Sequence, residues 1–372
     1  MIVEKRVFEL PRLETVGGAT IFDVRVGYET YGTLNADRSN AILVCHYFSG
    51  TSHAAGRYRE SDVLPGYWDY LIGPGKAIDT DRYFVVSSDT LVNLSAYDPT
   101  VTTTGPASTD PATGKPYGLS FPFVTIADFV RVQKALLDHL GIAHLHAVMG
   151  PSMGGLQTYE WAASFPDMMD RIIPVIAAAD SGPWLTAWLD VWASPIRVDP
   201  NWNGGDYYGR QPPLQGLTQA LKIVTLHANH WHWAEKYIGP RWAQEARDPL
   251  AALDNRYRIE EVLEEAAAGR VAVSDANHFL YLVKANQSFI PGRGAGATSA
   301  AEGLKRIKAR ALVLYAPSDQ VFAAEWVERT AKTIAANGTS VETAQIEGDF
   351  GHLNGVLGLG KLGPQIAEFL AR

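Results

Sequence analysis

The sequence lacks the features of several protein classes. Its 372 residues contain one cysteine, Cys45, which excludes an internal disulfide and a zinc site built from several thiolates. Lys and Arg number 32 against 40 Asp and Glu, and no basic run is long enough to follow a phosphate backbone. No apolar stretch is long enough to cross a bilayer. We therefore expect neither nucleic acid nor a membrane as a partner.

The N-terminus also lacks the apolar core of a signal peptide, since it reads Met1 to Arg6 with three charged residues. We therefore expect a cytoplasmic protein. With 47% hydrophobic and 19% charged residues, the chain is long enough for one large or two modest globular domains. Cys45 ends an apolar run and is expected to be buried.

Short apolar runs alternate with helical patterns along most of the chain. The alternating stretch 21–31 suggests antiparallel strands at a sheet edge. Buried parallel strands are predicted at 41–45, 83–87, 145–150, 172–177, 311–315 and 341–346, and helices at 126–140, 156–165 and 365–370. This order predicts an α/β fold with a mostly parallel central sheet and helices on both faces.

The alternation of strands and helices stops from about Asp180 to Ile290, where we predict aromatic-rich helices and no clear strand. We predict a core domain of residues 1–179 and 296–372 and an inserted helical lid of residues 180–295, with Gly292 to Thr298 as the most linker-like stretch. Trp184, Trp188 and Trp192 repeat every four residues. Such a stripe either packs the lid helices together or forms an apolar wall over a site.

Gly150-Pro151-Ser152-Met153-Gly154 has the pattern Gly-x-Ser-x-Gly. A glycine-rich turn can produce this pattern by chance, but here a strand precedes it and a helix follows. That context indicates a nucleophile elbow, in which a cramped turn presents the serine at the top of the sheet. The hydroxyl of Ser152 would lie near a helix N-terminus, which favours a developing negative charge.

A serine nucleophile needs a base and an acid that orients the base. His352 follows the last predicted strand, and Asp319 follows the strand before it, so we predict Ser152, Asp319 and His352 as the triad. Asp349 is the alternative acid, although it more simply forms a turn. Competing histidines are His46, His53, His227, His230 and His232. The last three could suggest a metal site, but further ligands at suitable spacing are missing, and we expect no metal and no cofactor.

The oxyanion of an acyl transfer reaction is usually held by two backbone N–H groups. We predict Met153, directly after the serine, and Phe48, in the segment 46–50 that follows an early strand. That segment could also be a simple glycine-ended turn.

These residues resemble the homoserine O-acetyltransferase superfamily of α/β-hydrolases along nearly the whole chain. The matching segments are the elbow and residues 28–35, 73–80, 104–106, 110–118, 199–207 and 318–322. The resemblance implies an α/β-hydrolase fold with a helical lid, the triad named above, an acyl-enzyme intermediate and commonly a homodimer.

The departures from the family pattern concern the substrate. Ala193 stands where the family's transferases carry an arginine for the carboxylate of homoserine, and Leu353 stands where they carry an aspartate for its amino group. Burying a zwitterion without charged partners costs several kcal/mol. Arg197 lies nearby as an alternative cation. We predict Trp184, Trp188, Ala193 and Leu353 as pocket residues.

The sequence thus favours the hydrolytic branch of that superfamily, a serine carboxylic-ester hydrolase acting on small, short-acyl alkyl esters such as acetates. The alternative is an O-acyltransferase that passes an acyl group from acyl-CoA to homoserine or another small alcohol. A third hypothesis is a binding scaffold without catalysis.

Overall fold

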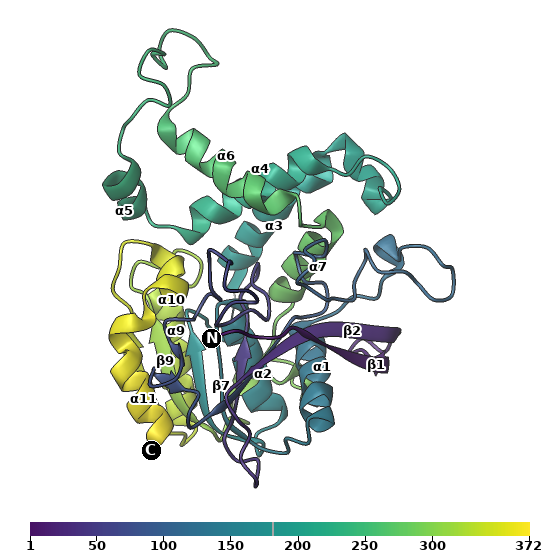
Figure 1. Cartoon of the computed structure of the whole chain (residues 1–372), viewed down its shortest axis with the longest axis vertical. Coiled ribbons are helices and arrows are strands. Elements are labelled where there is room, and N and C mark those ends of the chain that lie inside the picture. Colours follow the sequence, from purple (N-terminus) through teal and green to yellow (C-terminus); the bar gives the residue numbers. More distant parts are fainter. Residues whose placement is uncertain (181) are drawn as a thin grey trace.

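An eight-stranded sheet forms the centre of the part of the chain that this computed structural model describes, residues 1–180 and 182–372 (Figure 1). The strands lie in the order β1 (Arg6–Glu14), β2 (Thr20–Tyr31), β6 (Phe84–Ser88), β3 (Ala41–Cys45), β7 (Leu145–Pro151), β8 (Met169–Val175), β9 (Arg310–Tyr315) and β10 (Val341–Gln345). β2 pairs antiparallel with β1 and with β6, whereas the other pairs are parallel. The predicted mostly parallel sheet with an antiparallel edge is confirmed. A separate short pair consists of β4 (Ile72–Gly73) and β5 (Ile78–Asp79).

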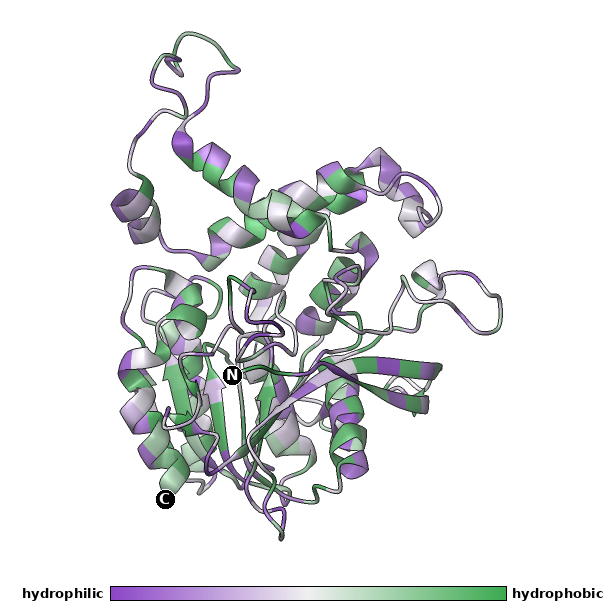
Figure 2. Cartoon of the chain, viewed as in Figure 1, coloured by the Kyte–Doolittle hydropathy of each residue, from purple (hydrophilic) through white to green (hydrophobic). Residues whose placement is uncertain are grey.

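Helices cover both faces of the sheet, which explains why β3 is apolar throughout. Leu43 and Cys45 face one core, shared with α1 (Ile126–His139), α2 (Met153–Ser164) and α9 (Ala324–Ala336). Ile42 and Val44 face the other core, shared with α11 (Gly363–Ala371). Figure 2 shows the hydrophobic strands enclosed between these layers. The predicted burial of Cys45 is confirmed.

The lid helices lie between β8 and β9 in the sequence and above the carboxyl ends of the strands (Figure 1). They are α3 (Gly182–Val198), α4 (Leu214–Ala228), α5 (Trp231–Trp233), α6 (Arg258–Val271) and α7 (Ala276–Gln287). α4 packs against both α3 and α6. No strand of the sheet comes from residues 182–295, although the division into two domains itself stays a prediction.

Short elements complete the described chain: α8 (Ala300–Leu304), α10 (Asn354–Leu357), and the short helices η1 (Gly118–Ser120), η2 (Pro200–Gly205), η3 (Ala234–Ile238), η4 (Arg293–Ala295), η5 (Gly351–Leu353) and η6 (Leu359–Leu362). Among the described residues, none of the helices has both the length and the apolar character needed to cross a membrane.

The linker-like stretch 292–298 is fastened to the core. The buried carboxyl of Glu160 on α2 accepts hydrogen bonds from the N–H groups of Gly292, at 2.7 Å, and Gly294, at 3.0 Å. Burial raises the pKa of Glu160. The return of the chain from the lid to the sheet is therefore held at a fixed place.

Candidate active site

Ser152 sits at the sharp turn between β7 and α2. Its backbone has φ 57° and ψ −120°, a strained conformation for a residue with a side chain. The neighbouring glycines allow the turn, because a Cβ on Gly150 or Gly154 would lie 2.4 or 2.2 Å from the carbonyl oxygen of Cys45. The small residues of the Gly-x-Ser-x-Gly pattern thus let the elbow pass against the end of β3.

The structure brings Ser152, His352 and Asp319 together as a hydrogen-bonded row. The Ser152 Oγ lies 2.8 Å from Nε2 of His352, and Nδ1 of His352 lies 2.7 Å from Oδ2 of Asp319. The other carboxylate oxygen of Asp319 accepts the N–H groups of Val321, at 2.7 Å, and Phe322, at 2.9 Å. With a proton on Nδ1 facing the carboxylate, Nε2 is free to accept the serine proton. This geometry fits a nucleophile, a base and an orienting acid.

The alternative acid lies in a different environment. The carboxylate of Asp349 binds Nζ of Lys236 and lies 3.4 Å from the hydroxyl of Tyr237. The cation holds the pKa of Asp349 below its usual range. Asp349 is therefore engaged with the lid, while Asp319 holds the imidazole.

The competing histidines also have other partners. His53 stacks on Tyr58 and bonds to Glu29 at 2.9 Å, and His230 and His232 contact each other in the lid. In residues 1–180 and 182–372, no group of three or more His, Cys, Asp or Glu side chains is arranged to hold a metal ion.

His46 fixes the loop that carries the predicted oxyanion donor Phe48. The carbonyl oxygen of Tyr47 accepts from Nδ1 of His46, at 2.7 Å, and from the N–H of Gly50, at 2.9 Å. Burial lowers the pKa of His46, so the ring is neutral and its Nε2 faces the Asn93 amide at 3.3 Å. Because a trans peptide is planar, the N–H of Phe48 points away from these contacts.

Phe48 lines the cavity that contains Ser152, and Met153 is the first residue of α2. The first N–H groups of a helix have no partner within the helix. Met153 directly follows the nucleophile and Phe48 shares its cavity, and the role of both N–H groups in catalysis stays a prediction.

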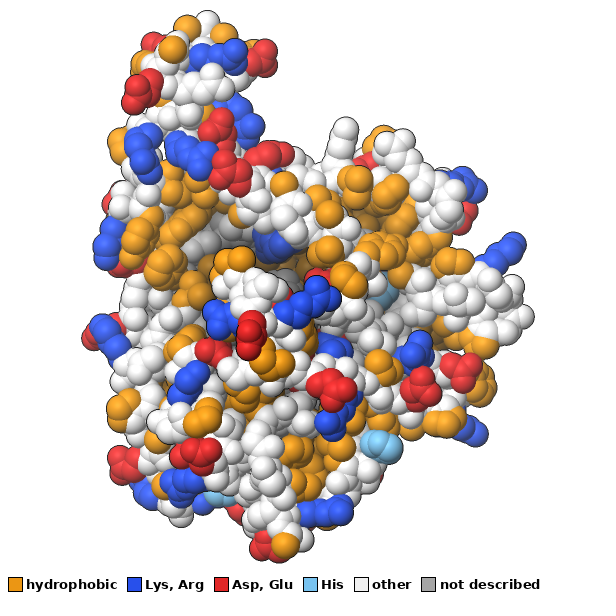
Figure 3. Space-filling view, viewed as in Figure 1, with side chains coloured by type: hydrophobic (Ala, Val, Ile, Leu, Met, Phe, Trp, Pro, Cys, Tyr) orange, Lys and Arg blue, Asp and Glu red, His pale blue; other side chains and the backbone are white. Residues whose placement is uncertain are grey.

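A cavity of about 240 Å³ opens beside the triad, between the loop after β3 and the lid. Its walls are mostly apolar, and on the face shown in Figure 3 hydrophobic side chains gather where the lid meets the core. The residues that line it are Tyr47, Phe48, Ser49, Ser152, Trp192, Val224, Thr225, Ala228, Ala266, Arg270, His352, Leu353 and Val356.

The predicted pocket residues divide into two groups. Leu353 lines the cavity, but Trp184 is 61% exposed, and Trp188 and Ala193 are not among the lining residues. Trp188 instead stacks on His227, with ring centroids 4.2 Å apart. Trp192 is the tryptophan of the stripe that reaches the cavity. The repeat of tryptophans every four residues correctly indicated a helix, but it did not show which face of that helix lines the cavity.

The predicted alternative cation does not reach the cavity either. Arg197 is exposed and bonds to Asp190 at 2.5 Å. The cavity contains a different arginine, Arg270 of α6, which sequence reasoning missed. Its apolar context, Ala266-Ala267-Ala268-Gly269-Arg270-Val271, is the signal that could have pointed to it.

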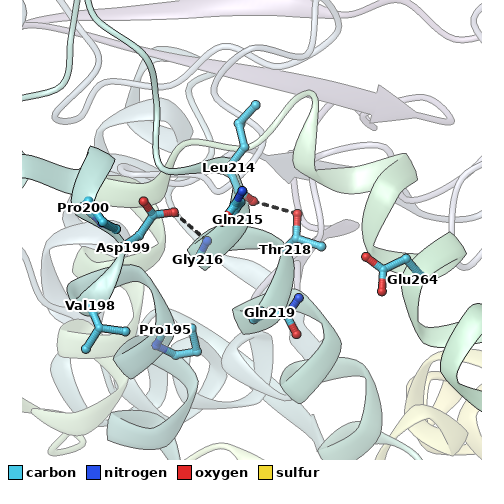
Figure 4. Close-up of a pocket in the computed structure, with 10 residues that line it drawn as sticks. All are labelled: Pro195, Val198, Asp199, Pro200, Leu214, Gln215, Gly216, Thr218, Gln219 and Glu264. Carbon is cyan, nitrogen blue, oxygen red and sulfur yellow. Dashed lines mark hydrogen bonds between the residues drawn. The ribbon is translucent and has the colours of Figure 1, made fainter. Parts of the chain in front are cut away.

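A second hollow, of about 500 Å³, lies in the lid between the end of α3, the start of α4 and Glu264 of α6 (Figure 4). Two of the polar groups drawn there have partners, since Asp199 accepts the N–H of Gly216 at 2.7 Å and the Thr218 hydroxyl donates to the Leu214 carbonyl at 2.7 Å. None of the triad residues lines this hollow, so the smaller cavity is the candidate active site.

His227 connects the lid to the loop that carries Asp319. The Nε1 of Trp192 donates to Nδ1 of His227 at 3.2 Å, and Nε2 of His227 lies 3.0 Å from the carbonyl oxygen of Gln320. Both ring nitrogens are used only if His227 is neutral, with its proton on Nε2. Burial lowers the pKa of His227 to about 4.

This pKa predicts a loss of stability in acid. An unfolded histidine takes up a proton as the pH falls through about 6.5, whereas folded His227 resists protonation until about pH 4. The free energy of unfolding should therefore fall across this window, by up to about 3 kcal/mol from this residue alone. In His227→Gln that component is absent. Urea unfolding at pH 7, 5.5 and 4.5 checks this expectation, with His139→Gln, a substitution of an exposed histidine, as the control. Parallel curves for wild type and His227→Gln would contradict the expectation.

Comparison with known proteins gives the same fold over nearly the whole chain. Residues 64–356 match the alpha/beta hydrolase fold family. A homoserine O-acetyltransferase of Methanococcoides burtonii is 39% identical over 355 residues, which cover 95% of this chain and 70% of that protein. These matches confirm the predicted fold class.

Solved structures of two kinds of enzyme are similar to this one. The crystal structure of esterase E22 has 46% sequence identity and a TM-score of 0.94, and the alignment covers 99% of this chain and 100% of that one. The homoserine O-acetyltransferase from Bacillus anthracis has 38% identity and a TM-score of 0.93, with 100% and 98% covered. An esterase and an acetyltransferase therefore share this architecture.

Proposed function

Given that the chain belongs to the homoserine O-acetyltransferase superfamily of α/β-hydrolases, we propose that it is a serine carboxylic-ester hydrolase acting on small, short-acyl esters. The fold and the triad geometry are common to hydrolysis and acyl transfer. The choice between them depends on what the cavity offers a second substrate.

The charge of the cavity wall is the main support for this proposal. Among the described residues, the lining contains one cation, Arg270, and neither Asp nor Glu. The position next to the base is Leu353, whose apolar side chain lines the cavity. The ammonium group of homoserine would be buried here without an anion, which costs several kcal/mol. Water needs no such partner.

In the proposed mechanism, His352 removes the proton of Ser152 while the serine oxygen attacks the ester carbonyl. The N–H groups of Phe48 and Met153 hold the oxyanion, and Asp319 stabilises the imidazolium. His352 then protonates the leaving alcohol, which leaves an acyl group on Ser152. His352 then takes a proton from a water molecule that attacks the acyl-enzyme, and returns it to the oxygen of Ser152 as the acid leaves.

Two observations support the alternative, acyl transfer to homoserine. Arg270 could meet the carboxylate of homoserine from a different element than in the family's transferases. Proteins named homoserine O-acetyltransferase are also similar to this chain at 39% identity.

A competition experiment tests the proposal. The purified protein is given a short-chain acetate ester with and without homoserine, and separately acetyl-CoA with homoserine. We expect acetate as the main product in the first reaction at every homoserine concentration, and only slow acetylation in the second. Faster acetylation of homoserine than ester hydrolysis would make the protein a transferase.

A further inference from the structure

Arg270 has an unusual environment for a charged residue. Its side chain lines the cavity of Ser152, and it donates from Nε to the carbonyl of Ala266 at 3.0 Å. Its Nη2 donates to the carbonyl of Leu221 at 3.2 Å and to the hydroxyl of Thr225. All these acceptors are neutral oxygens. In the described part of the chain, no carboxylate lies within the 4.0 Å of an ion pair with it.

Other arginines near the same helix do have carboxylate partners. Arg258 at the start of α6 bonds to Glu261 and Glu265, and Arg256 lies 3.4 Å from Glu264. These ion pairs are partly exposed to solvent, and pairing near the surface contributes little to stability. Arg270 is the more buried group, and burial lowers its pKa. A guanidinium stays charged in proteins, so the uncompensated charge is held where an anion would be most strongly favoured.

Tyr47 adds a second donor on the same wall. It precedes Phe48 in the loop after β3, and its side chain lines the cavity. Burial raises the pKa of Tyr47, so its hydroxyl keeps its proton, and Tyr47 and Arg270 line the same cavity. Within the described residues, the Tyr47 hydroxyl makes no hydrogen bond to the protein, so its proton is available to a ligand.

We propose that Arg270 and the Tyr47 hydroxyl form an anion subsite within the active-site cavity, so that the preferred substrates are small esters that carry a free carboxylate. This inference rests on the proposed ester hydrolysis. The carboxylate can belong to the acyl part, as in a half-ester of a dicarboxylic acid, or to the alcohol part, as in an acylated hydroxy acid.

The rest of the cavity favours a carboxylate over a phosphate monoester. The single positive charge of Arg270 matches a single negative charge. Its Nε and Nη2 already donate to protein oxygens, so the two N–H groups of Nη1 remain for a carboxylate oxygen. The remaining walls include Trp192, Val224 and Val356, which offer no partner to a second negative charge. A volume of about 240 Å³ also restricts the ligand to a short chain.

The test compares esters that carry a free carboxylate with esters of the same length in which a neutral carboxamide replaces that carboxylate. One pair is 4-nitrophenyl hemiglutarate and 4-nitrophenyl glutaramate, with the charge on the acyl part. The other is 4-acetoxybutanoate and 4-acetoxybutanamide, with the charge on the alcohol part. We expect wild type to prefer the charged member of one pair by about 10- to 100-fold in kcat/KM, mainly through KM, since a charge-assisted hydrogen bond has this strength.

The variants assign the preference to Arg270. In Arg270→Met the ratio of charged to neutral substrate should fall to near one, and Arg270→Lys should restore part of it. Arg197→Met removes an exposed lid arginine outside the cavity and should leave the ratio unchanged. Equal rates for both members of both pairs in wild type, or a preference that survives in Arg270→Met, would overturn the inference.

A binding measurement separates this inference from the proposed function. Glutaramate, the monoamide of glutarate with a single carboxylate, is titrated calorimetrically into wild type and into Arg270→Met, without any reaction. Binding that is lost in Arg270→Met supports the anion subsite even if neither ester is hydrolysed, in which case the proposed hydrolysis fails alone. If the neutral esters are hydrolysed but glutaramate does not bind and no charge preference is found, the proposed function stands and the anion subsite is overturned.

Discussion

Ser152→Ala is expected to lower kcat for a short acetate ester by about 10⁵- to 10⁶-fold, the scale seen when the nucleophile of a serine hydrolase is removed. The hydroxyl lies 2.8 Å from Nε2 of His352, and alanine leaves the base with no proton to accept. Only binding and oxyanion stabilisation would remain. Steady-state hydrolysis of 4-nitrophenyl acetate measures the effect, and the unfolding midpoint shows that the variant is folded.

Ser49 provides a matched control, because this second serine also lines the cavity. Covalent labelling by a fluorophosphonate should persist in Ser49→Ala and disappear in Ser152→Ala. If Ser152→Ala kept normal hydrolysis, the entire triad assignment would be wrong.

Asp319→Asn should lower kcat by about 10⁴-fold, the loss known for a triad aspartate in a serine protease. The Asp319 carboxylate accepts from His352 Nδ1 at 2.7 Å while its other oxygen is held by two backbone N–H groups. An amide NH₂ facing the ring would favour the tautomer with its proton on Nε2, which cannot accept from the serine. A pH profile of kcat measures the residual activity across the titration of the base.

The control for this variant is Asp349→Asn, three residues before the base. It breaks the contact with Lys236 at the edge of the lid and leaves the hydrogen bond of His352 to Asp319 in place. We expect most of the activity to remain. If Asp349→Asn lost more activity than Asp319→Asn, the assignment of Asp319 as the acid of the triad would be wrong.

Elements of the fold could be predicted where their own residues show a clear pattern, and were missed where they do not. The strand Ala41–Cys45 was predicted with its observed bounds, because a buried parallel strand is apolar on both faces. The start of α1 was predicted from Thr125 and Asp128, whose carboxylate accepts the N–H of Thr125 at 2.7 Å. In contrast, Arg6–Glu14 was not located as a strand, because Pro11 and alternating charges hide it. Proline is tolerated there because β1 is an edge strand.

The site shows the same division between local and tertiary information. Ser152, Asp319 and His352 follow strand ends, and parallel strands bring such positions to one edge of a sheet, so their meeting could be expected from the chain order. The packing of α3 on α4 decides which tryptophan faces the cavity. The spacing of the tryptophans in the sequence gives no information on this packing. Arg270 reaches the cavity from α6, far from any motif, and only the packed lid reveals it.

The mass of the enzyme during turnover tests most directly whether Ser152 forms an acyl-enzyme that water hydrolyses. The protein is mixed with a short acetate ester, quenched in acid within milliseconds and digested for mass spectrometry. We expect one acetyl group on the peptide that contains Ser152, and we expect this group to be lost in water without homoserine or any other acceptor. An acetyl group on a different residue, or an acetylated Ser152 that is released only when an alcohol is added, would contradict this expectation.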